Sequence, residues 1–286
     1  MKQKLAFTVD VEDGIFLSMR DEYGKLIPQT ERVLINTHQI LDVLQKHGQR
    51  GTFFTLGMVA DAYPDLVKRI ANEGHELAVH GYHHWVLTKM SPQEAKEELG
   101  KAKDVLEQLT GAQVRGHRAP AFSLIPDTTW LFDVLGELGY TYDSSVLPSN
   151  IGGYHWQSFG EDAKRVEGAH GPIAEFPLPV VQLAKWKIPF SGGGYMRMLP
   201  GPVYQQLMKR YGKSGAVPIH YMHPYELDTT PYPQWYKDEF EAKGTLKRIK
   251  VFANKWNRGS VHSKIDRLAA MYSCITMSEL LEETQF

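Results

Sequence analysis

The stretch Leu5-Ala-Phe-Thr-Val-Asp10-Val-Glu-Asp-Gly14 begins with a short, mostly apolar run and ends in a cluster of carboxylates. An apolar run without polar alternation is typical of a strand buried on both faces of a parallel sheet. Carboxylates directly after such a strand cost free energy unless they are solvated, paired or bound to a metal. The stretch therefore predicts a parallel α/β fold with functional groups at the strand ends.

An alternation of helix-like and strand-like segments follows. Apolar residues at helical spacing run from Thr30 to His47, and Gly48 ends the pattern. Repeated strand–helix units imply parallel strands with helices outside them, so an α/β barrel or an open α/β sheet. Further helices are predicted at 60–72, 94–109, 127–138, 202–211 and 265–271, and further strands at 51–56, 76–79, 114–118, 140–142 and 217–222.

The remaining stretch from Leu147 to Gly194 is rich in Gly, Pro and Trp and is predicted to form long, partly β loops. We find no internal repeat, low-complexity tract or linker, so we expect a single domain over residues 1–286. The segment 265–271 is the last helix that the pattern supports before the tail.

The composition excludes several classes of protein. The chain has 286 residues, 23% of them charged, and a net charge of -1, so nothing indicates broad attraction to nucleic acid or an anionic membrane. The single cysteine, Cys274, excludes an intrachain disulfide framework. No apolar stretch is long enough for a signal peptide, and none approaches the ~18 residues of a membrane span. We therefore expect a cytoplasmic protein without stable membrane insertion; no pattern indicates an oligomeric state.

Polar residues stand at or just past the ends of five different predicted strands. These residues are Asp10, His80, Arg118, Asp143 and His223. In parallel α/β folds, functional groups gather where strands end and loops begin. We therefore expect these five side chains to converge on one face of the sheet.

His80 and His84 form a candidate metal-binding pair. If the segment after the third strand is helical, their spacing of four residues puts both imidazoles on one face. Two histidines and a carboxylate are a common catalytic set for zinc and leave one position open for water. His83 would point roughly 100° away on a helix, so we interpret it as a neighbour rather than a ligand.

The chain resembles the polysaccharide deacetylase family, which is carbohydrate esterase family 4 with the NodB-homology fold. The family has five motifs in order, and each has a counterpart here. The counterparts are Thr8-Val-Asp-Val-Glu-Asp-Gly14, His80-Gly-Tyr-His-His84, Arg118-Ala-Pro120, Tyr142-Asp-Ser-Ser145 and Tyr221-Met-His-Pro-Tyr-Glu226. The resemblance runs from about residue 5 to residue 281 and implies an irregular (β/α)7-type barrel.

Three further segments resemble a bacterial branch found in exopolysaccharide and lipopolysaccharide gene neighbourhoods. They are Glu175-Phe-Pro177, Ser191-Gly-Gly-Gly-Tyr-Met-Arg197 and the His223-Pro-Tyr-Glu226 signature. The glycines at 192–194 are not a phosphate-binding P-loop, because neither a helix start nor a lysine follows them as that motif requires. We expect a loop bordering the sugar site.

The resemblance implies roles for the matched residues in removing an N-acetyl group from a sugar. Asp10 would be the general base, Arg118 its ion-pair partner, His223 the general acid, and the Ala121 N–H a donor to the oxyanion. Substrate contacts are expected from Asp143, Tyr195 and Tyr225; Asp143 could instead orient His223. The family's paired aspartates are split here by Val11-Glu12.

This departure leaves the acidic metal ligand open between Glu12 and Asp13. Strand alternation puts Asp10 and Glu12 on the same side, which favours Glu12. A bulge or turn at Glu12 would instead deliver Asp13, which keeps the residue type of the family and its following glycine. We prefer Asp13, with His80 and His84, as the ligand set. Zn²⁺ suits these ligands best, and Co²⁺, Ni²⁺ or Fe²⁺ would also fit.

Two other functions compete with sugar N-deacetylation. Relatives on this fold hydrolyse cyclic amides or imides such as allantoin, and the altered first motif is compatible with them. A metal-free carbohydrate-binding barrel is the alternative from another class of function. The combination of Asp10, Arg118 and His223 argues against it, because binding alone needs neither a base nor an acid.

Overall fold

The protein is built around a curved nine-stranded sheet. The computed structural model describes residues 2–212, 215–244, 251 and 255–286. The strands are hydrogen-bonded in the order β10-β1-β2-β3-β4-β5-β7-β6, and β11 pairs with β1. Their bounds are β1 Lys4–Val11, β2 Thr52–Thr55, β3 Glu76–Val79, β4 Gly116–His117, β5 Tyr142–Asp143, β6 Lys164–Gly168, β7 Gly171–Glu175, β10 Ile219–Met222 and β11 Ser273–Ile275.

The strands from β10 to β7 are parallel to their neighbours, whereas β6 is antiparallel to β7. Within the described part of the chain, seven parallel strands thus follow one another around the sheet. Because parallel strands place their carboxyl ends at the same edge, the ends of β1, β3, β4 and β10 open onto one side of the molecule. This arrangement confirms the predicted irregular (β/α)7-type barrel.

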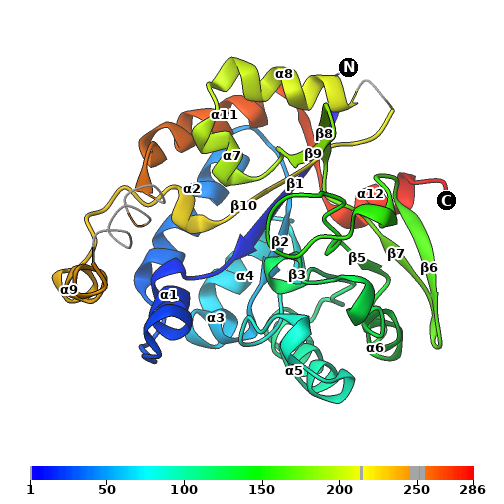
Figure 1. Ribbon diagram of the computed structural model, residues 1–286, viewed down its shortest axis with the longest axis horizontal. Helices are drawn as coiled ribbons and strands as arrows, with labels where there is room; N and C mark the ends of the chain where they lie inside the picture. The colour runs from blue at the N-terminus through cyan, green and yellow to red at the C-terminus, as the bar shows by residue number, and fades with distance from the viewer. Residues whose placement is uncertain (1, 213–214, 245–250, 252–254) are drawn as a thin grey trace.

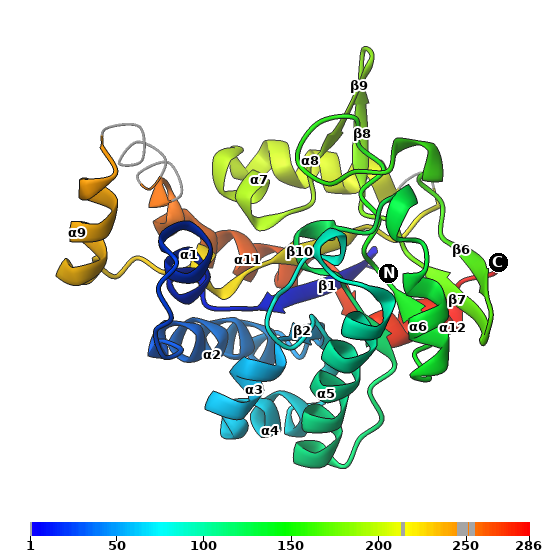
Figure 2. The same cartoon turned by 60° about the horizontal axis from the view of Figure 1, so that its bottom comes forward.

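Helices cover the outside of the sheet, as Figures 1 and 2 show for α2 to α5 alongside β1 to β3. In α2, buried apolar residues such as Ile40, Leu41 and Leu44 face the strands, which explains their helical spacing. The helices are α1 Gly14–Tyr23, α2 Glu31–Lys46, α3 Gly57–Ala62, α4 Pro64–Asn72, α5 Pro92–Thr110, α6 Leu131–Glu137, α7 Gly193–Met198, α8 Gly201–Gly212, α9 Gln234–Ala242, α11 Val261–Met271 and α12 Met277–Glu283. Short 3₁₀ segments are η1 Leu87–Lys89, η2 Pro120–Phe122, η3 Pro126–Thr128, η4 Gln157–Phe159, η5 Pro224–Glu226 and η6 Arg258–Ser260.

Strand β1 has different side chains on its two faces. Phe7 and Val9 belong to the large core between the sheet and the helices, whereas Ala6 belongs to a smaller cluster with Phe54 and Ala78. Since successive side chains of a strand point to opposite faces, Asp10 follows Ala6 onto the inner face. The strand thereby carries a carboxylate into the interior of the barrel.

Most predicted elements are present, with several differences. Helices α1, α7 and α9 were not predicted, and α7 begins at Gly193, so the expectation of a loop without a helix start at residues 192–194 is wrong. The predicted helix 60–72 is divided into α3 and α4, because Pro64 occupies the first turn of α4. The stretch 147–194 contains β6 and β7, which join the main sheet, and a hairpin of β8 (Val180–Leu183) and β9 (Trp186–Pro189) that projects from the body in Figure 2. The segment after Met271, in which the pattern supported no further helix, contains β11 and α12.

Helix α12 had a recognisable start signal. Thr276 and Glu279 form a reciprocal capping box at its N-terminus, the same device that Ser91 and Glu94 form at α5. No helix of the described chain has the length and apolarity needed to cross a bilayer.

Candidate active site

Four of the five predicted strand-end residues meet at the carboxyl edge of the sheet. Asp10 is the hub: its Oδ1 accepts a 2.8 Å hydrogen bond from Arg118 Nη1, and its Oδ2 lies 3.9 Å from His223 Nε2. His80 joins them through its Nδ1, which lies 2.8 Å from the carbonyl oxygen of Arg118. The fifth residue, Asp143, makes its contacts elsewhere, as described below.

A set of three potential metal ligands lies beside this hub. Glu12, His80 and His84 each offer one ligand atom, and these atoms lie within 4.8 Å of one another. Glu12 Oε2 is 2.8 Å from His84 Nε2 and 3.5 Å from His80 Nε2. This oxygen is buried and accepts no well-formed hydrogen bond from the described residues. An orphaned carboxylate oxygen between two imidazoles fits a divalent cation, since a buried acceptor without a partner is costly.

The acidic member of this set is Glu12, so the preference for Asp13 is wrong. The Asp13 carboxylate is occupied as the N-cap of α1, where its Oδ1 accepts from the amides of Ile15 and Phe16 at 2.9 and 3.2 Å. Its Oδ2 accepts from the amide of Thr30. Strand β1 continues without a bulge to Val11, so alternation puts Asp10 and Glu12 on the same side.

The segment between the two histidines is a loop, not the helix on which their pairing was predicted. Gly81 has φ 84° and His84 has φ 65°, both in the left-handed region. The turn nevertheless brings the two rings to a centroid distance of 5.2 Å. A left-handed conformation at a non-glycine residue costs roughly 1–3 kcal/mol and is often found at functional sites.

Helix α1 supports this loop from the other side. Arg20 donates to the carbonyl oxygen of His83, and its guanidinium lies 4.3 Å from the Trp85 ring centroid. His83 itself pairs with Glu98, with 2.5 Å between Nδ1 and Oε1, and so is a neighbour of the site as predicted.

His80 is held with one nitrogen available. The Arg118 carbonyl oxygen can only accept, so His80 Nδ1 carries the hydrogen of this 2.8 Å contact. Its Nε2 then presents a lone pair toward Glu12. A second partner that fixes the tautomer in this way is common for metal-binding histidines.

Arg118 is fully buried, and its side chain donates four hydrogen bonds. Its Nη1 donates to Asp10 and to Thr8 Oγ1, both at 2.8 Å, and its Nε and Nη2 donate to the Ser144 carbonyl and hydroxyl oxygens at 3.1 Å. The guanidinium carbon lies 4.0 Å from the Phe54 ring centroid. These contacts fix Asp10 with Oδ1 turned to the arginine and Oδ2 turned to His223.

His223 lies between two acidic groups. Its Nε2 is 3.6 Å from Glu12 Oε1, and its Nδ1 is 3.3 Å from Glu226 Oε1. Tyr225 stacks on the imidazole at 4.7 Å with an interplanar angle of 9°. Burial lowers the pKa of His223, but the charges of Glu12, Glu226 and Asp10 outweigh it and raise the pKa to about 9. The imidazolium form is therefore favoured near neutral pH.

The same charges act on Glu12 in the opposite sense. Burial raises its pKa, but His84 and His223 and hydrogen bonding by the histidines outweigh burial and hold the pKa well below its usual value. Glu12 is therefore ionised, as a metal ligand must be. Glu226 had no predicted role, although its spacing of three residues from His223 could have indicated the contact.

Asp143 contacts neither His223 nor the cavity described below. It is fully buried, with Oδ1 2.8 Å from His117 Nδ1 and 2.7 Å from Ser145 Oγ. Burial and the neighbouring Asp143 raise the pKa of Glu175 well above its usual value. Because Ser145 Oγ also accepts from the amide of Ala119 at 2.7 Å, this cluster supports the loop after Arg118.

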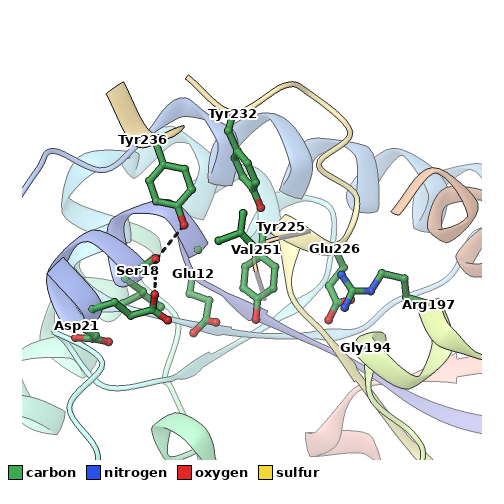
Figure 3. A pocket seen from close by; sticks show the side chains of 13 residues that line it. Glu12, Ser18, Asp21, Gly194, Arg197, Tyr225, Glu226, Tyr232, Tyr236 and Val251 are labelled. Carbon is green, nitrogen blue, oxygen red and sulfur yellow. Dashed lines mark hydrogen bonds between the residues drawn. The ribbon is translucent and has the colours of Figure 1, made fainter. Parts of the chain in front are cut away.

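A cavity of about 410 Å³ adjoins the site and has Glu12, Tyr225 and Glu226 in its wall. Figure 3 shows it with Tyr232 and Tyr236 on one side and Arg197 on another. Of the predicted substrate-binding residues, Tyr225 lines this cavity, whereas Tyr195 lies near Tyr221 and is not among the lining residues. Ala121 follows Arg118 in an exposed position with φ 54°.

Two family models cover most of the sequence. Residues 33–142 match the model described as polysaccharide deacetylase, and residues 144–282 match a domain of unknown function, DUF3473. A peptidoglycan-N-acetylglucosamine deacetylase from Bacillus cereus is 40% identical over 84 residues, which cover 29% of this chain and 30% of that protein. The chain spans less than half the length of the first curated relatives that it matches, since the matches cover 30%, 35% and 43% of them.

Solved structures share the fold at low sequence identity. A Mycobacterium smegmatis protein assigned to the polysaccharide deacetylases has a TM-score of 0.65 at 20% identity, covering 98% of this chain and 90% of that one. A Bacillus anthracis pseudoenzyme of carbohydrate esterase family 4 has a TM-score of 0.51 at 15% identity, covering 100% of this chain and 67% of that one. Residues 33–142 thus match the polysaccharide deacetylase family, and the chain as a whole shares the fold of solved structures assigned to that family.

Proposed function

We propose that this chain is a metal-dependent hydrolase that removes an N-acetyl group from a sugar and releases acetate. The observation that carries the proposal is the convergence of Glu12, His80 and His84 with an Asp10–Arg118 pair and a His223–Glu226 pair. A binding protein needs neither a buried base nor an opposed acid, whereas amide hydrolysis needs both. The family resemblance supports the same reaction.

Glu12, His80 and His84 would hold a divalent cation, for which Zn²⁺ suits the donor set best and Co²⁺, Ni²⁺ or Fe²⁺ are alternatives. When bound, such an ion polarises the acetyl carbonyl and lowers the pKa of water at the site. The buried, orphaned Glu12 Oε2 supports this assignment independently of the family.

The chain's own groups account for the proton movements. Asp10 Oδ2 takes the proton of the attacking water, and Arg118 on Oδ1 keeps the carboxylate oriented. The oxygen of the water bonds to the acetyl carbon, and the Ala121 N–H is proposed as a donor to the resulting oxyanion. His223 Nε2 then protonates the amine nitrogen as the C–N bond breaks, so that acetate and a free amino sugar leave.

Acetate release from N-acetylated saccharides tests the proposal. The Zn²⁺-loaded protein should release acetate, chelator treatment should abolish the release, and added Zn²⁺ should restore it. His223→Gln should retain the metal but lose most of the rate, since general acid catalysis contributes about 10²–10⁴-fold. A protein that binds no divalent metal and remains inactive with added Zn²⁺ would be a carbohydrate-binding barrel instead.

The altered first motif is also compatible with an alternative function, the hydrolysis of a cyclic amide or imide. That reaction would use the same ion, base and acid but would open a ring without releasing acetate. Incubation with allantoin or a cyclic imide, with acetate release from sugars measured in parallel, separates the two.

We also propose a role in the synthesis of a cell-surface polysaccharide or lipopolysaccharide. The support is the resemblance of the segments around Glu175, Ser191 and His223 to the branch found in such gene neighbourhoods. An intracellular N-acetyl sugar intermediate would suit the predicted cytoplasmic location. Comparing the acetyl content of surface polysaccharide between cells with and without the gene tests this role.

A further inference from the structure

We propose that Arg197 recognises a negatively charged group, a carboxylate or a phosphate, on the N-acetylated sugar. The inference rests on the proposed function and names the class of substrate. Arg197 lines the cavity that also contains Glu12 in its wall, so a ligand in contact with the arginine can reach the metal-binding residues. Its volume of about 410 Å³ is within the usual range for small-molecule sites.

The guanidinium of Arg197 has no partner in the described chain. Its Nε–H is buried and donates to no acceptor, and no hydrogen bond or ion pair joins its side chain to a described residue. Arg197 is the only arginine or lysine among the described residues that line the cavity. A buried donor of a charged group is costly when unpaired, so the arrangement favours an external acceptor.

Each carboxylate of the same cavity has a polar neighbour, and one oxygen of Glu12 and one of Glu226 have no hydrogen-bond partner among the described residues. Asp21 is 2.6 Å from Arg20 Nε, and Glu226 is 3.3 Å from His223 Nδ1. Glu12 contacts His84. Asp21, Glu12 and Glu226 thus each lie beside an arginine or a histidine, whereas the guanidinium of Arg197 forms no ion pair with a described residue. In Figure 3 its guanidinium reaches toward Glu226 and Tyr225, across the cavity from Ser18 and Asp21.

The backbone of Arg197 is held in place, so the charge has a defined position. Asn257 Nδ2 donates to the Arg197 carbonyl oxygen at 2.6 Å, and Lys264 Nζ donates to the carbonyl oxygens of Met196 and Leu199 at 2.8 and 2.9 Å. A Cβ on Gly193 would lie 2.7 Å from Glu226 Oε1, so glycine there lets α7 approach the His223–Glu226 pair closely. The glycine-rich segment thus positions Arg197 rather than binding phosphate with its own amides.

Arginine suits such a ligand because its planar fork can donate two hydrogen bonds to one carboxylate or phosphate. The rings of Tyr232 and Tyr236 give the opposite wall an apolar surface for the body of a sugar. A uronic acid and a sugar phosphate share this chemistry, so the test must contain both.

The experiment compares acetate release from N-acetylglucosamine, N-acetylglucosaminuronic acid and N-acetylglucosamine 1-phosphate by the Zn²⁺-loaded protein. At least one anionic sugar should have the lower KM. Arg197→Met should raise that KM about ten- to hundredfold, as expected for lost hydrogen bonds to a charged group, while the KM of the neutral sugar stays within about twofold. Arg197→Lys should be intermediate. Arg210→Met, an exposed change on α8, is the matched control and should alter neither.

Equal KM values for neutral and anionic sugars, or an equal change for both in Arg197→Met, would overturn the inference while acetate release still supports the proposed function. Calorimetric binding of the same three sugars gives a readout that needs no turnover. If no acetate is released but an anionic sugar binds wild type at least tenfold more tightly than Arg197→Met, the proposed reaction fails and the charge recognition stands. No preference for an anionic sugar in binding would sink the inference.

Discussion

Glu12 and Asp13 are adjacent in the chain, directly after the end of β1 at Val11, but their side chains have different partners. Glu12 still follows the alternation that carries Asp10 inward, whereas Asp13 has left the strand and caps α1. Gly14, the first residue of α1, leaves room for the ring of Tyr225. A Cβ at position 14 would lie 2.8 Å from that ring. One acidic cluster thereby contains the proposed base Asp10, the proposed metal ligand Glu12 and the helix cap Asp13.

Substitutions at these two positions should separate metal binding from stability. Glu12→Gln removes the anionic ligand and should weaken Zn²⁺ binding by more than about hundredfold, since even outer-shell changes cost 10–100-fold. Asp13→Ala removes a cap and should lower the free energy of unfolding by about 0.5–2 kcal/mol while keeping the metal content. Metal analysis and urea unfolding measure both. Full metal loss in Asp13→Ala with full retention in Glu12→Gln would reverse the assignment.

Two buried histidines away from the site should make stability fall in mild acid. Burial lowers the pKa of both His75 and His220 to about 4. The unfolded chain takes up these protons near pH 6.5, so between the two values the unfolded state binds more protons. The stabilisation is present above pH 6.5 and is lost as the pH falls toward about 4, by roughly 2 kcal/mol for each histidine between pH 7.5 and 5.0.

Urea unfolding of the chelator-treated protein at these two pH values checks this expectation. His220→Gln cannot titrate, so its stability should fall less than that of wild type over the same interval. Because both proteins share the other titratable groups, the difference between them isolates His220. Identical pH dependence in the two proteins would show that His220 does not contribute.

At the scale of elements, hydrophobic periodicity predicted the strands and amphipathic helices but not the conformation of irregular loops. The buried run of β1 and the amphipathic pattern of α2 follow from burial on two faces or one. The two rings of His80 and His84 lie close together as predicted, but on a loop and not on the predicted helix. A loop with two left-handed residues has no periodic sequence pattern by which it could be predicted. To choose between Glu12 and Asp13 as the acidic ligand, the end of β1 would have to be predicted to within one residue. Strand ends are the least predictable feature of a strand.

The loop between the histidines offers a test at this scale. Gly81→Ala forces a side chain into φ 84°, at a cost of about 1–2 kcal/mol, although the added Cβ meets Pro120 only at an ordinary 3.7 Å. We expect lower thermal stability and weaker Zn²⁺ binding, because the loop must retain its shape to keep His84 beside Glu12. Gly111→Ala, at φ 68° in open space after α5, is the control and should cost stability without changing metal affinity. Equal effects of both variants on metal affinity would contradict this account of the loop.

At the scale of the whole molecule, the two family models meet inside the sheet. The first model ends at residue 142 and the second begins at 144, yet β5 pairs with β7 and β1 pairs with β10 and β11. The proposed site is divided in the same way, since His223 comes from the second segment and the metal-binding residues precede it. We therefore propose that the two segments form one folding unit, as the absence of a linker in the sequence predicted.

Truncation after residue 143 tests this proposal. Residues 1–143 would leave β1 without β10 and β11, β5 without β7, and the buried Arg118 without its acceptors on Ser144. Losing a partner of a buried charge alone costs about 3–5 kcal/mol, which is comparable to the whole stability of many domains. We expect the fragment to show no cooperative thermal transition and rapid proteolysis, with the 286-residue chain as the control. A fragment that unfolds cooperatively and binds Zn²⁺ through Glu12, His80 and His84 would instead define the first segment as a domain of its own, with the second segment as an addition that supplies His223.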